Sequence, residues 1–382
     1  MRGRALAAIA AIAVLALFAG CGSSSASSTS ASNSSASSTG AASSTASAQA
    51  SNASGSSSTS SCGSKPGVKA SGTPINLGAI ATKEPGSDFS DVPNMVAAYF
   101  DCVNDNGGIT GHPVKMFIEF NQGQPAQVAA AAAQLIQTDH VVGIVGAFDL
   151  LECTINANYW QKLGVYELDA GIAPGCWSTP NSASVNMGPR FTSDGAVQYA
   201  LTKHPSKIVF VEANIPVAGY MAAGPAALAK AAGVPMTTQI VRSPVQDPNS
   251  VALNAVNAAG PNGWVDLAFT PPDALPVLQA AQKLGLEDRV KGWGCSSTCN
   301  TDFLAKALGP KWNHKLFVNA ELADPDDHNG TDMQLYKAIF NKYGHNVSGG
   351  IGSFSEFGFL DAKIAAYRKV AGTGPMTNPS GS

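Results

Sequence analysis

Seven cysteines are the most reactive side chains of this 382-residue sequence, and their spacing limits the chemistry open to them. Cys21 stands apart near the N-terminus, which leaves an even set of six. In an oxidising compartment an even set favours disulfides. We expect near neighbours to pair: Cys295 with Cys299, Cys153 with Cys176, and Cys62 with Cys102. A zinc site at Cys295 and Cys299 is the alternative, but no second Cys or His pair follows at zinc-like spacing.

Acidic residues gather between positions 324 and 332, where metal binding is the other chemistry to consider. The cluster consists of Asp324, Asp326, Asp327, His328 and Asp332. Its spacing lacks the terminal bidentate Glu of an EF-hand calcium loop, so we interpret it as a solvated loop. The sequence therefore predicts no metal site.

Sequence motifs for catalysis are missing. There is no P-loop, no Gly-x-Ser-x-Gly elbow and no His-Glu-x-x-His motif, and the glycines at 349, 350 and 352 do not follow a strand in dinucleotide-binding spacing. Asp and His are present without a poised nucleophile. We therefore expect no cofactor and no enzymatic activity.

The first twenty residues have the pattern of a signal peptide. Arg2 and Arg4 precede an apolar stretch from 5 to 19, which is too short to span a bilayer comfortably, and the small residues Ala19 and Gly20 end it. This pattern predicts export of the chain, with residues 1–20 removed.

Cys21 directly follows this segment and is the expected site of lipid attachment. Residues 17–21 are similar to a bacterial lipobox, whose Leu usually stands three residues before the cysteine; here Phe18 holds that place and Leu17 precedes it. We expect a lipid on Cys21 to anchor the exported chain to the cell membrane. The alternative is an ordinary secretory signal cut near Ala19, which also exports the chain and leaves Cys21 as a thiol.

Residues 21–61 form the expected linker between this anchor and a globular body. From 22 to 61 the chain is nearly all Ser, Ala, Thr, Gly and Asn, without charged or aromatic residues. Such a segment buries too little apolar surface to offset its ordering entropy. As a flexible coil of about 40 residues it would reach roughly 35 Å.

The body beyond the linker is nearly neutral and is long enough for two α/β domains. A formal charge of −3 and a pI near 6.1, without a basic cluster, argue against nucleic acid as a partner. No second apolar run approaches twenty residues.

Short apolar runs alternate with longer amphipathic stretches through the body, which is typical of parallel α/β units. We expect strands at 75–80, 114–120, 141–145, 165–168, 208–211, 237–241, 265–269, 290–293 and 316–320. We expect helices at 92–104, 126–137, 154–163, 195–203, 220–232, 250–259, 274–284, 302–308, 332–343 and 354–370. Their order predicts two doubly wound halves, whose ligands bind beyond the carboxyl ends of the strands.

Three segments carry a resemblance to a known family. Residues 75–80 (INLGAI) resemble the first strand of type I periplasmic binding proteins, residues 104–114 (NDNGGITGHPV) resemble their Gly-Gly-Ile turn, and residues 141–146 (VVGIVG) resemble their third strand. By pattern the chain is similar to the branched-chain amino-acid (Leu/Ile/Val) binding proteins of ABC transporters. The similarity covers roughly residues 73 to 371.

The resemblance implies an α/β fold of two doubly wound parallel-sheet lobes joined by a hinge, the type I periplasmic binding protein fold. We expect the first lobe to comprise 62–190 and 316–382, and the second lobe 191–315, with crossovers near 188–193 and 312–319. In the family a final helix and strand return to the second lobe. We expect this C-terminal return to be shortened here.

The family also implies a function. Its members capture a small molecule by closure of the two lobes and present it to the permease of an ABC importer, without chemistry. We expect the same of this chain, as an extracytoplasmic monomer held at the membrane through Cys21. A ligand-sensing receptor module of the same fold is the first alternative, and a surface enzyme or adhesive protein on a serine-rich stalk is the second.

The chain departs from the amino-acid binders where they hold their ligand. In those proteins a hydroxyl after the third strand and a Ser/Thr-bearing loop after the fourth hold the carboxylate, and an acidic residue of the second lobe holds the ammonium. Here the hydroxyl position falls on Leu150, the loop becomes 169–173 (DAGIA), and the acidic position falls near Ser296. We therefore expect the ligand not to be a standard α-amino acid.

Other residues beyond the expected strands still offer contacts to a neutral polar or carboxylated molecule. The predicted ligand-binding residues are Phe89, Phe148, Asp149, Leu150, Gly171, Ile172, Val217, Tyr220, Thr270, Asp273, Ser296 and Ser297. Helix capping remains the alternative for Asp149 and Asp273, and core packing for Tyr220. For Phe89 the alternative is a solvated loop. Replacing Gly171 with Trp is expected to abolish ligand binding while preserving the fold.

Overall fold

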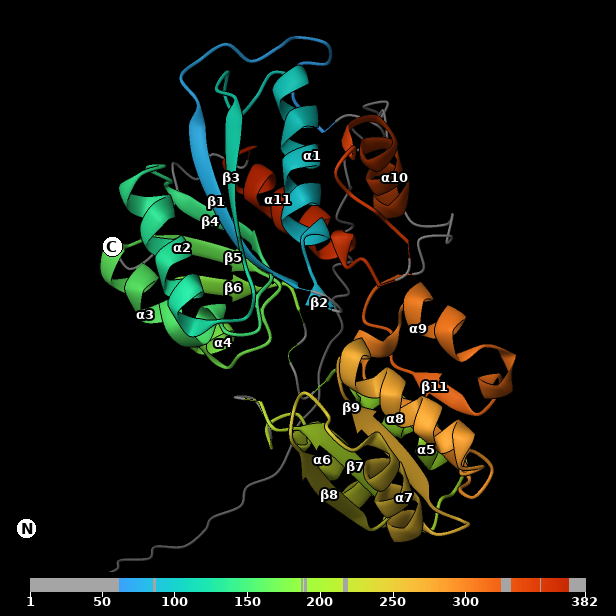
Figure 1. The fold of residues 1–382 in the computed structure, drawn as a ribbon. Coiled ribbons are helices and arrows are strands. Elements are labelled where there is room, and N and C mark those ends of the chain that lie inside the picture. Colours follow the sequence, from blue (N-terminus) through green and yellow to red (C-terminus); the bar gives the residue numbers. More distant parts are fainter. Residues whose placement is uncertain are drawn as a thin grey trace, which may run out of the picture. The chain divides into compact units, whose positions relative to one another are not determined.

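Two parallel β-sheets, each covered by helices, organise the chain (Figure 1). The computed structural model describes residues 62–84, 87–186, 188, 191–215, 219–323, 331–350 and 352–370. These residues all belong to one compact unit that spans positions 57–382. The signal peptide, Cys21, the linker, Val217 and the acidic residues at 324–328 lie outside the described residues.

The first sheet is parallel except for one short edge strand. Its strands are β1 (Ile75–Glu84), β2 (Ser87–Asp88), β3 (Val114–Asn121), β4 (Gly143–Ala147), β5 (Tyr166–Asp169) and β6 (Ser182–Ser184). The parallel strands follow the order β3-β1-β4-β5-β6, with Ile75 opposite Val114 and Gly78 opposite Ile144. Strand β2 turns back antiparallel on the end of β1.

Helices cover both faces of this sheet (Figure 1). They are α1 (Asp91–Asp105), α2 (Pro125–Gln137), α3 (Glu152–Leu163), α4 (Gly175–Ser178), α10 (Thr331–Tyr343) and α11 (Ser355–Val370). Met95 of α1 and Phe359 of α11 join one buried cluster with Val145 of β4. On the other face Leu135 of α2 packs close to Gly78, where a Cβ atom would stand only 3.0 Å from the Leu135 side chain. Glycine at this position therefore lets α2 approach the strand.

The second sheet is parallel throughout, in the order β11-β10-β9-β7-β8. Its strands are β7 (Ile208–Ala213), β8 (Met236–Val241), β9 (Trp264–Ala268), β10 (Gly292–Cys295) and β11 (Leu316–Val318). Because β11 pairs with β10, this sheet extends past residue 315, the predicted end of the second lobe.

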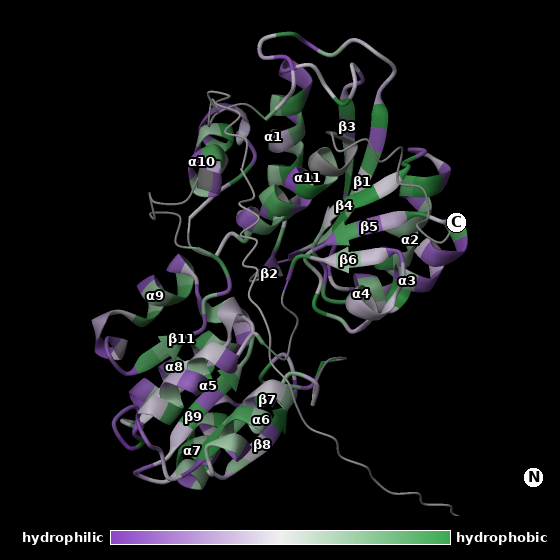
Figure 2. Cartoon of the chain, turned by 180° about the vertical axis from the view of Figure 1, so that it is seen from behind, coloured by the Kyte–Doolittle hydropathy of each residue, from purple (hydrophilic) through white to green (hydrophobic). Residues whose placement is uncertain are grey.

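Helices that mix hydrophobic and hydrophilic residues surround the second sheet (Figure 2). They are α5 (Asp194–Thr202), α6 (Ala223–Ala231), α7 (Pro248–Ala259), α8 (Pro271–Lys283) and α9 (Asp302–Leu308), with the 3₁₀ turns η1 (Ser297–Cys299) and η2 (Pro310–Trp312). One face packs on α7 and α8 around Trp293, and the other packs on α5 and α6 around Trp264. Both tryptophans are fully buried.

Each strand and helix expected from the sequence is present, with ends that differ by a few residues. The strands β2 and β6, the helix α4 and the two 3₁₀ turns are additional. They are only two to four residues long, too short to establish a hydrophobic period.

Three disulfides join the expected cysteine pairs. Cys62 is bonded to Cys102 of α1, Cys153 of α3 to Cys176 of α4, and Cys295 of β10 to Cys299 of η1. No described helix is both long and apolar enough to cross a bilayer.

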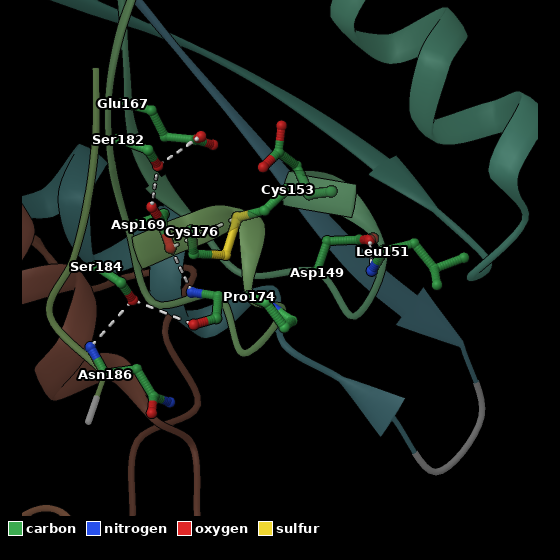
Figure 3. Close-up of a disulfide and its surroundings, with 12 residues drawn as sticks. Asp149, Leu151, Cys153, Glu167, Asp169, Pro174, Cys176, Ser182, Ser184 and Asn186 are labelled. Atoms are coloured by element: carbon green, nitrogen blue, oxygen red, sulfur yellow. Dashed lines mark hydrogen bonds between the residues drawn. A yellow bond between two sulfur atoms is a disulfide. The ribbon is translucent and has the colours of Figure 1, made fainter. Parts of the chain in front are cut away.

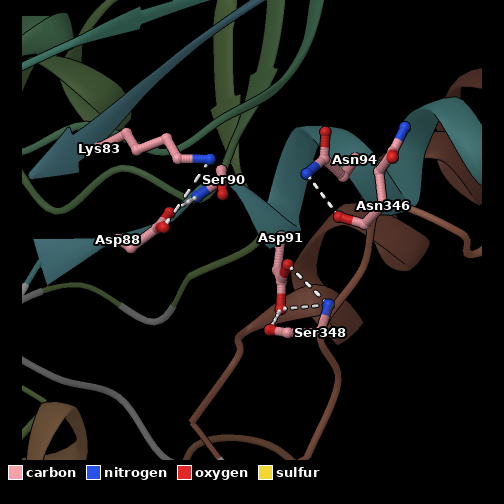
Figure 4. Close-up of polar contacts among 7 residues, drawn as sticks. All are labelled: Lys83, Asp88, Ser90, Asp91, Asn94, Asn346 and Ser348. Carbon is pink, nitrogen blue, oxygen red and sulfur yellow. Dashed lines mark hydrogen bonds and ion pairs between the residues drawn. The ribbon is translucent and has the colours of Figure 1, made fainter.

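The segment before α11 is tied to the start of α1 by hydrogen bonds (Figure 4). The Asp91 carboxylate accepts bonds from the Ser348 amide at 3.0 Å and from the Gly349 amide at 3.2 Å, and also from the Ser348 hydroxyl. Asn94 donates to the carbonyl of Asn346 at 2.8 Å. These contacts join α1 to residues more than 250 positions later in the chain.

Candidate ligand-binding site

A pocket lies where the strands of both sheets end. Its walls come from the carboxyl ends of β1, β4, β5 and β6 of the first sheet, and from those of β7, β8, β9, β10 and β11 of the second. Open α/β sheets place ligands at this edge, where the loops leave the strands. The volume available to the centres of water-sized molecules is about 120 Å³. One water needs roughly 10 to 15 Å³ by this measure, so the pocket accommodates a small molecule.

One side of the pocket is aromatic. Phe89, Phe148 and Phe354 form a contiguous group, with Phe89 stacked on Phe148 at 4.4 Å between ring centres and Phe354 edge-on to both at 6.1 and 5.6 Å. All three side chains are buried. Leu150 and Ile172 add aliphatic surface to the same pocket. This side offers an apolar platform for a ligand.

The loops of the second sheet contribute hydroxyl groups to the pocket that are already bonded to the protein. Ser296 and Thr298 both donate to the carbonyl of Phe269, at 3.2 and 2.6 Å, and their hydroxyls lie 2.8 Å apart. The Asp273 carboxylate accepts bonds from the Ser243 hydroxyl at 2.6 Å and the Val245 amide at 2.7 Å. Both oxygens of Asp273 therefore have protein partners.

Glu321 is the exception among the acidic residues of the pocket. It follows β11 and lines the pocket beside Ser297, and its Oε1 atom is buried without a hydrogen-bond partner among the described residues. Burial raises the pKa of Glu321 to about 7, and a hydrogen bond with Ser297 opposes this rise.

Comparisons with known proteins agree with this architecture. A family model described as periplasmic binding protein matches residues 74–374. The chain belongs to this periplasmic binding protein family. Members of the family bind solutes and are not enzymes, and their place is outside the cytoplasm. No curated protein matched the sequence closely enough to count as a relative.

Several solved structures share the fold. A leucine-binding protein from Thermotoga maritima MSB8 aligns with a TM-score of 0.65 at 14% identity, covering 78% of this chain and 83% of that chain. A fatty acid ABC transporter substrate-binding protein from Thermomonospora curvata gives 0.67 at 16% identity, covering 80% and 77%. A solute-binding protein from R. palustris in complex with 4-hydroxybenzoate gives 0.59 at 15% identity, covering 78% of each.

This periplasmic binding protein brings most of the predicted ligand-binding residues to one pocket. Those that line it are Phe89, Phe148, Leu150, Ile172, Thr270, Asp273, Ser296 and Ser297. Phe89, Phe148 and Leu150, which were predicted from the sequence to lie beside the ligand, are thus found in one pocket. Their contact with a ligand stays a prediction.

Asp149 does not line the pocket, because its carboxylate is used inside the first sheet. It accepts hydrogen bonds from the Thr82 hydroxyl at 2.6 Å, the Asn121 amide group at 2.7 Å and the Leu151 backbone at 2.7 Å. The Leu151 amide belongs to the residue just before α3, so this hydrogen bond resembles the helix capping that was the alternative for Asp149.

Gly171 also lies outside the pocket lining. Its amide, expected to be available to a ligand, donates to Asp169 Oδ1 at 2.7 Å. A Cβ atom at Gly171 would overlap the Cys176 sulfur and stand 3.0 Å from that of Cys153. The expectation that Gly171→Trp preserves the fold is therefore wrong, since the Cβ atom alone would already collide with the disulfide.

Tyr220 is 37% exposed and stacks against Trp177, with ring centres 6.4 Å apart, rather than lining the pocket. It is therefore not a buried core residue, the alternative that the sequence left open.

A group of buried carboxylic acids, among them Glu167 and Asp169, lies in the first sheet near the Cys153–Cys176 disulfide (Figure 3). Ser182 donates to Glu167 at 3.1 Å and to Asp169 at 3.0 Å, and Glu152 accepts from the indole of Trp160 at 2.7 Å. Burial raises the pKa of Asp169 to about 7 and that of Glu167 well above its usual value, with Glu152 adding to both rises. Neighbouring cysteines cannot complete a metal site here, because they form a disulfide.

Sequence reasoning missed several residues of the pocket. Glu321, Asn186, Ser243, Met221 and Phe354 line it but were not predicted. The first three follow β11, β6 and β8, so the rule that ligands bind at the carboxyl ends of strands could have found Glu321 and Ser243. Strand β6 itself was not predicted, so the same rule could not have found Asn186.

Proposed function

We propose that this protein is a membrane-anchored solute-binding protein that captures a small molecule and delivers it to an ABC importer. The observation that carries the proposal is the pocket, which collects residues from the carboxyl ends of strands in both sheets of a periplasmic binding protein. Capture by closure follows from this layout, because a ligand held by residues of one sheet gains contacts from the other when the lobes close.

The solute differs from a standard α-amino acid in this proposal. Leu150, at the position where amino-acid binders have a carboxylate-anchoring hydroxyl, lines the pocket with a purely aliphatic side chain. The Gly171 amide, the other group considered for a carboxylate, is already bonded to Asp169. An α-carboxylate would therefore lose its water without gaining these hydrogen bonds.

A thermal-shift screen tests ligand capture. The mature chain, with Cys21→Ser to keep it in solution, is heated with amines, amides, carboxylic acids, polyols, nucleobases and amino acids. A ligand at 100 times its dissociation constant stabilises the native state by about 2.7 kcal/mol, which raises the melting temperature measurably. Stabilisation by one chemical class supports capture; a folded protein that responds to nothing in the library refutes it.

Anchoring and delivery need separate tests. The wild-type chain should partition into the membrane fraction and incorporate a fatty-acid label, and Cys21→Ser should release it. Uptake of the identified solute should fall in cells that lack this chain and recover with wild type. A wild-type chain that stays soluble without label would refute the anchor, and unchanged uptake would refute delivery.

A further inference from the structure

The charged groups of the pocket all have the same sign. Glu84, Asp273 and Glu321 contribute carboxyl groups, and none of the described residues that line the pocket is Lys, Arg or His. An anionic ligand would therefore be held next to negative charge without a compensating cation among these residues. A cationic or donor-rich ligand would meet favourable electrostatics.

The three acids differ in what they can offer a ligand. Each oxygen of Asp273 already accepts a hydrogen bond, from Ser243 and from Val245, as described above. Glu84 directs its carboxylate towards Gly123, since a Cβ built there would stand 3.7 Å from Glu84 Oε1. Glu321 alone combines a place in the pocket wall with a buried oxygen that has no hydrogen-bond partner among the described residues. A buried acceptor of this kind is costly unless a ligand satisfies it.

The residues that share the pocket with Glu321 indicate the shape of the ligand. Phe89, Phe148 and Phe354 offer ring surfaces in the same pocket that Glu321 lines. A ligand that satisfies both has an apolar body and a polar head that donates hydrogen bonds, and the negative charge of the pocket favours a cationic head. The small volume of the pocket limits this body to about one ring or a short chain.

We propose that the captured solute is a small organic amine, whose ammonium group binds Glu321 and whose aromatic or aliphatic body packs against the phenylalanines. This inference rests on the proposed function and adds the chemical class of the solute. It separates this chain from the structural neighbour crystallised with 4-hydroxybenzoate, which binds a carboxylic acid.

Three probes of similar size that differ in the charge of their head group test the proposal. Benzylamine, benzamide and benzoate share a ring and differ in the head group, and binding is measured by calorimetry at pH 8, where Glu321 is mostly ionised. Benzylamine should bind at least about tenfold more tightly than benzoate, because hydrogen bonds to a charged partner are the stronger ones. Tighter binding of benzoate or benzamide, or no binding of benzylamine, would overturn the proposal.

Glu321→Gln supplies the second arm, since it keeps the shape of the side chain and removes its charge. It should weaken benzylamine about tenfold or more and bring benzoate closer to benzylamine in affinity. Glu119→Gln is the matched control, because Glu119 lies on β3 outside the pocket lining and should leave both affinities unchanged. Equal effects of the two substitutions would contradict a specific role of Glu321.

The outcome also distinguishes this inference from the proposed function. If carboxylic acids or sugars stabilise the protein in the broad screen and amines do not, solute capture stands and the amine inference fails. If no compound stabilises the folded protein, both fail.

Discussion

Asp266 provides a sharp test of how burial controls the stability of the second sheet. It lies on β9 between Phe210 of β7 and Gly294 of β10, and its side chain is fully buried. Neither carboxyl oxygen has a hydrogen-bond partner among the described residues. Burial alone raises the pKa of Asp266 to about 8. The folded protein therefore holds this proton at neutral pH, whereas the unfolded chain has released it.

The sign and size of the effect follow from proton linkage. Because the folded-state pKa is raised, the native state binds one more proton than the unfolded state between about pH 4 and pH 8. The contribution of Asp266 to stability is fully present below about pH 4 and is lost as pH rises towards 8. One proton corresponds to about 1.4 kcal/mol per pH unit, so about 3 kcal/mol is lost between pH 5 and pH 7.

Asp266→Asn isolates this contribution from the other buried acids, since Asn keeps the shape and does not titrate. Urea unfolding is measured at pH 5, 6 and 7 for wild type and variant. The variant should gain about 3 kcal/mol relative to wild type over this range. Asp247→Asn is the control, because Asp247 is exposed and its pKa is lowered by hydrogen bonds from Ser250. The difference in free energy of unfolding between this variant and wild type should therefore not depend on pH above pH 5. A difference between wild type and Asp266→Asn that is independent of pH would refute the reasoning.

Three further predictions concern packing and cross-links, each measured by urea unfolding. Replacing Cys62 and Cys102 together by Ser should lower the free energy of unfolding by about 4 kcal/mol, because the bond closes a loop of 40 residues; no loss would contradict this. Gly294→Ala should cost about 1 to 3 kcal/mol, because its Cβ would overlap Asp266 Oδ2, and a neutral result would show that the strands yield freely. Phe148→Ala should cost about 3 to 5 kcal/mol through loss of its ring contacts, and a cost below 1 would show that the aromatic group is loosely packed.

The order of strands and helices could be predicted because most elements are long enough to show their hydrophobic period. Strand β9 (WVDLA) and strand β7 (IVFVEA) are buried along their whole lengths, and parallel strands covered on both faces have this composition. Strand β6 reads Ser-Ala-Ser and is only partly buried, so nothing in its composition distinguishes it from a loop. It is a strand because it pairs with β5.

Side-chain roles were harder to predict, since distant partners decide them. Asp149 was a reasonable pocket residue, but Thr82 and Asn121, which are 67 and 28 positions earlier, bind its carboxylate. Gly171 is buried beside a disulfide whose position depends on the packing of α3 and α4. Phe89 and Phe148 do line the pocket, and Phe148 follows the end of a strand that the sequence identified.

Glu321 was missed because the family resemblance directed attention to a different position. The acidic position of the amino-acid binders falls near Ser296 in this chain, which suggested that an ammonium group would lack a counter-charge. The fold instead brings Glu321, from the end of the neighbouring strand β11, to the same pocket as Ser296. Adjacent strands of one parallel sheet end at the same edge. An acidic residue that is missing after one strand can therefore be replaced by one that follows the neighbouring strand.

Buried carboxyl groups in this protein consequently have different roles, which depend on whether they line the pocket. Asp266 and Asp169 have raised pKa values, to about 8 and about 7, yet neither lines this pocket, so we expect their protons to affect stability. Glu321 has a pKa raised to about 7 by the same desolvation, but it borders an accessible cavity. A cation in this cavity would lie beside the Glu321 carboxyl group, as the proposal requires. The raised pKa alone does not identify a binding residue; the proposal for Glu321 rests on the combination of an unpartnered oxygen and an adjacent cavity.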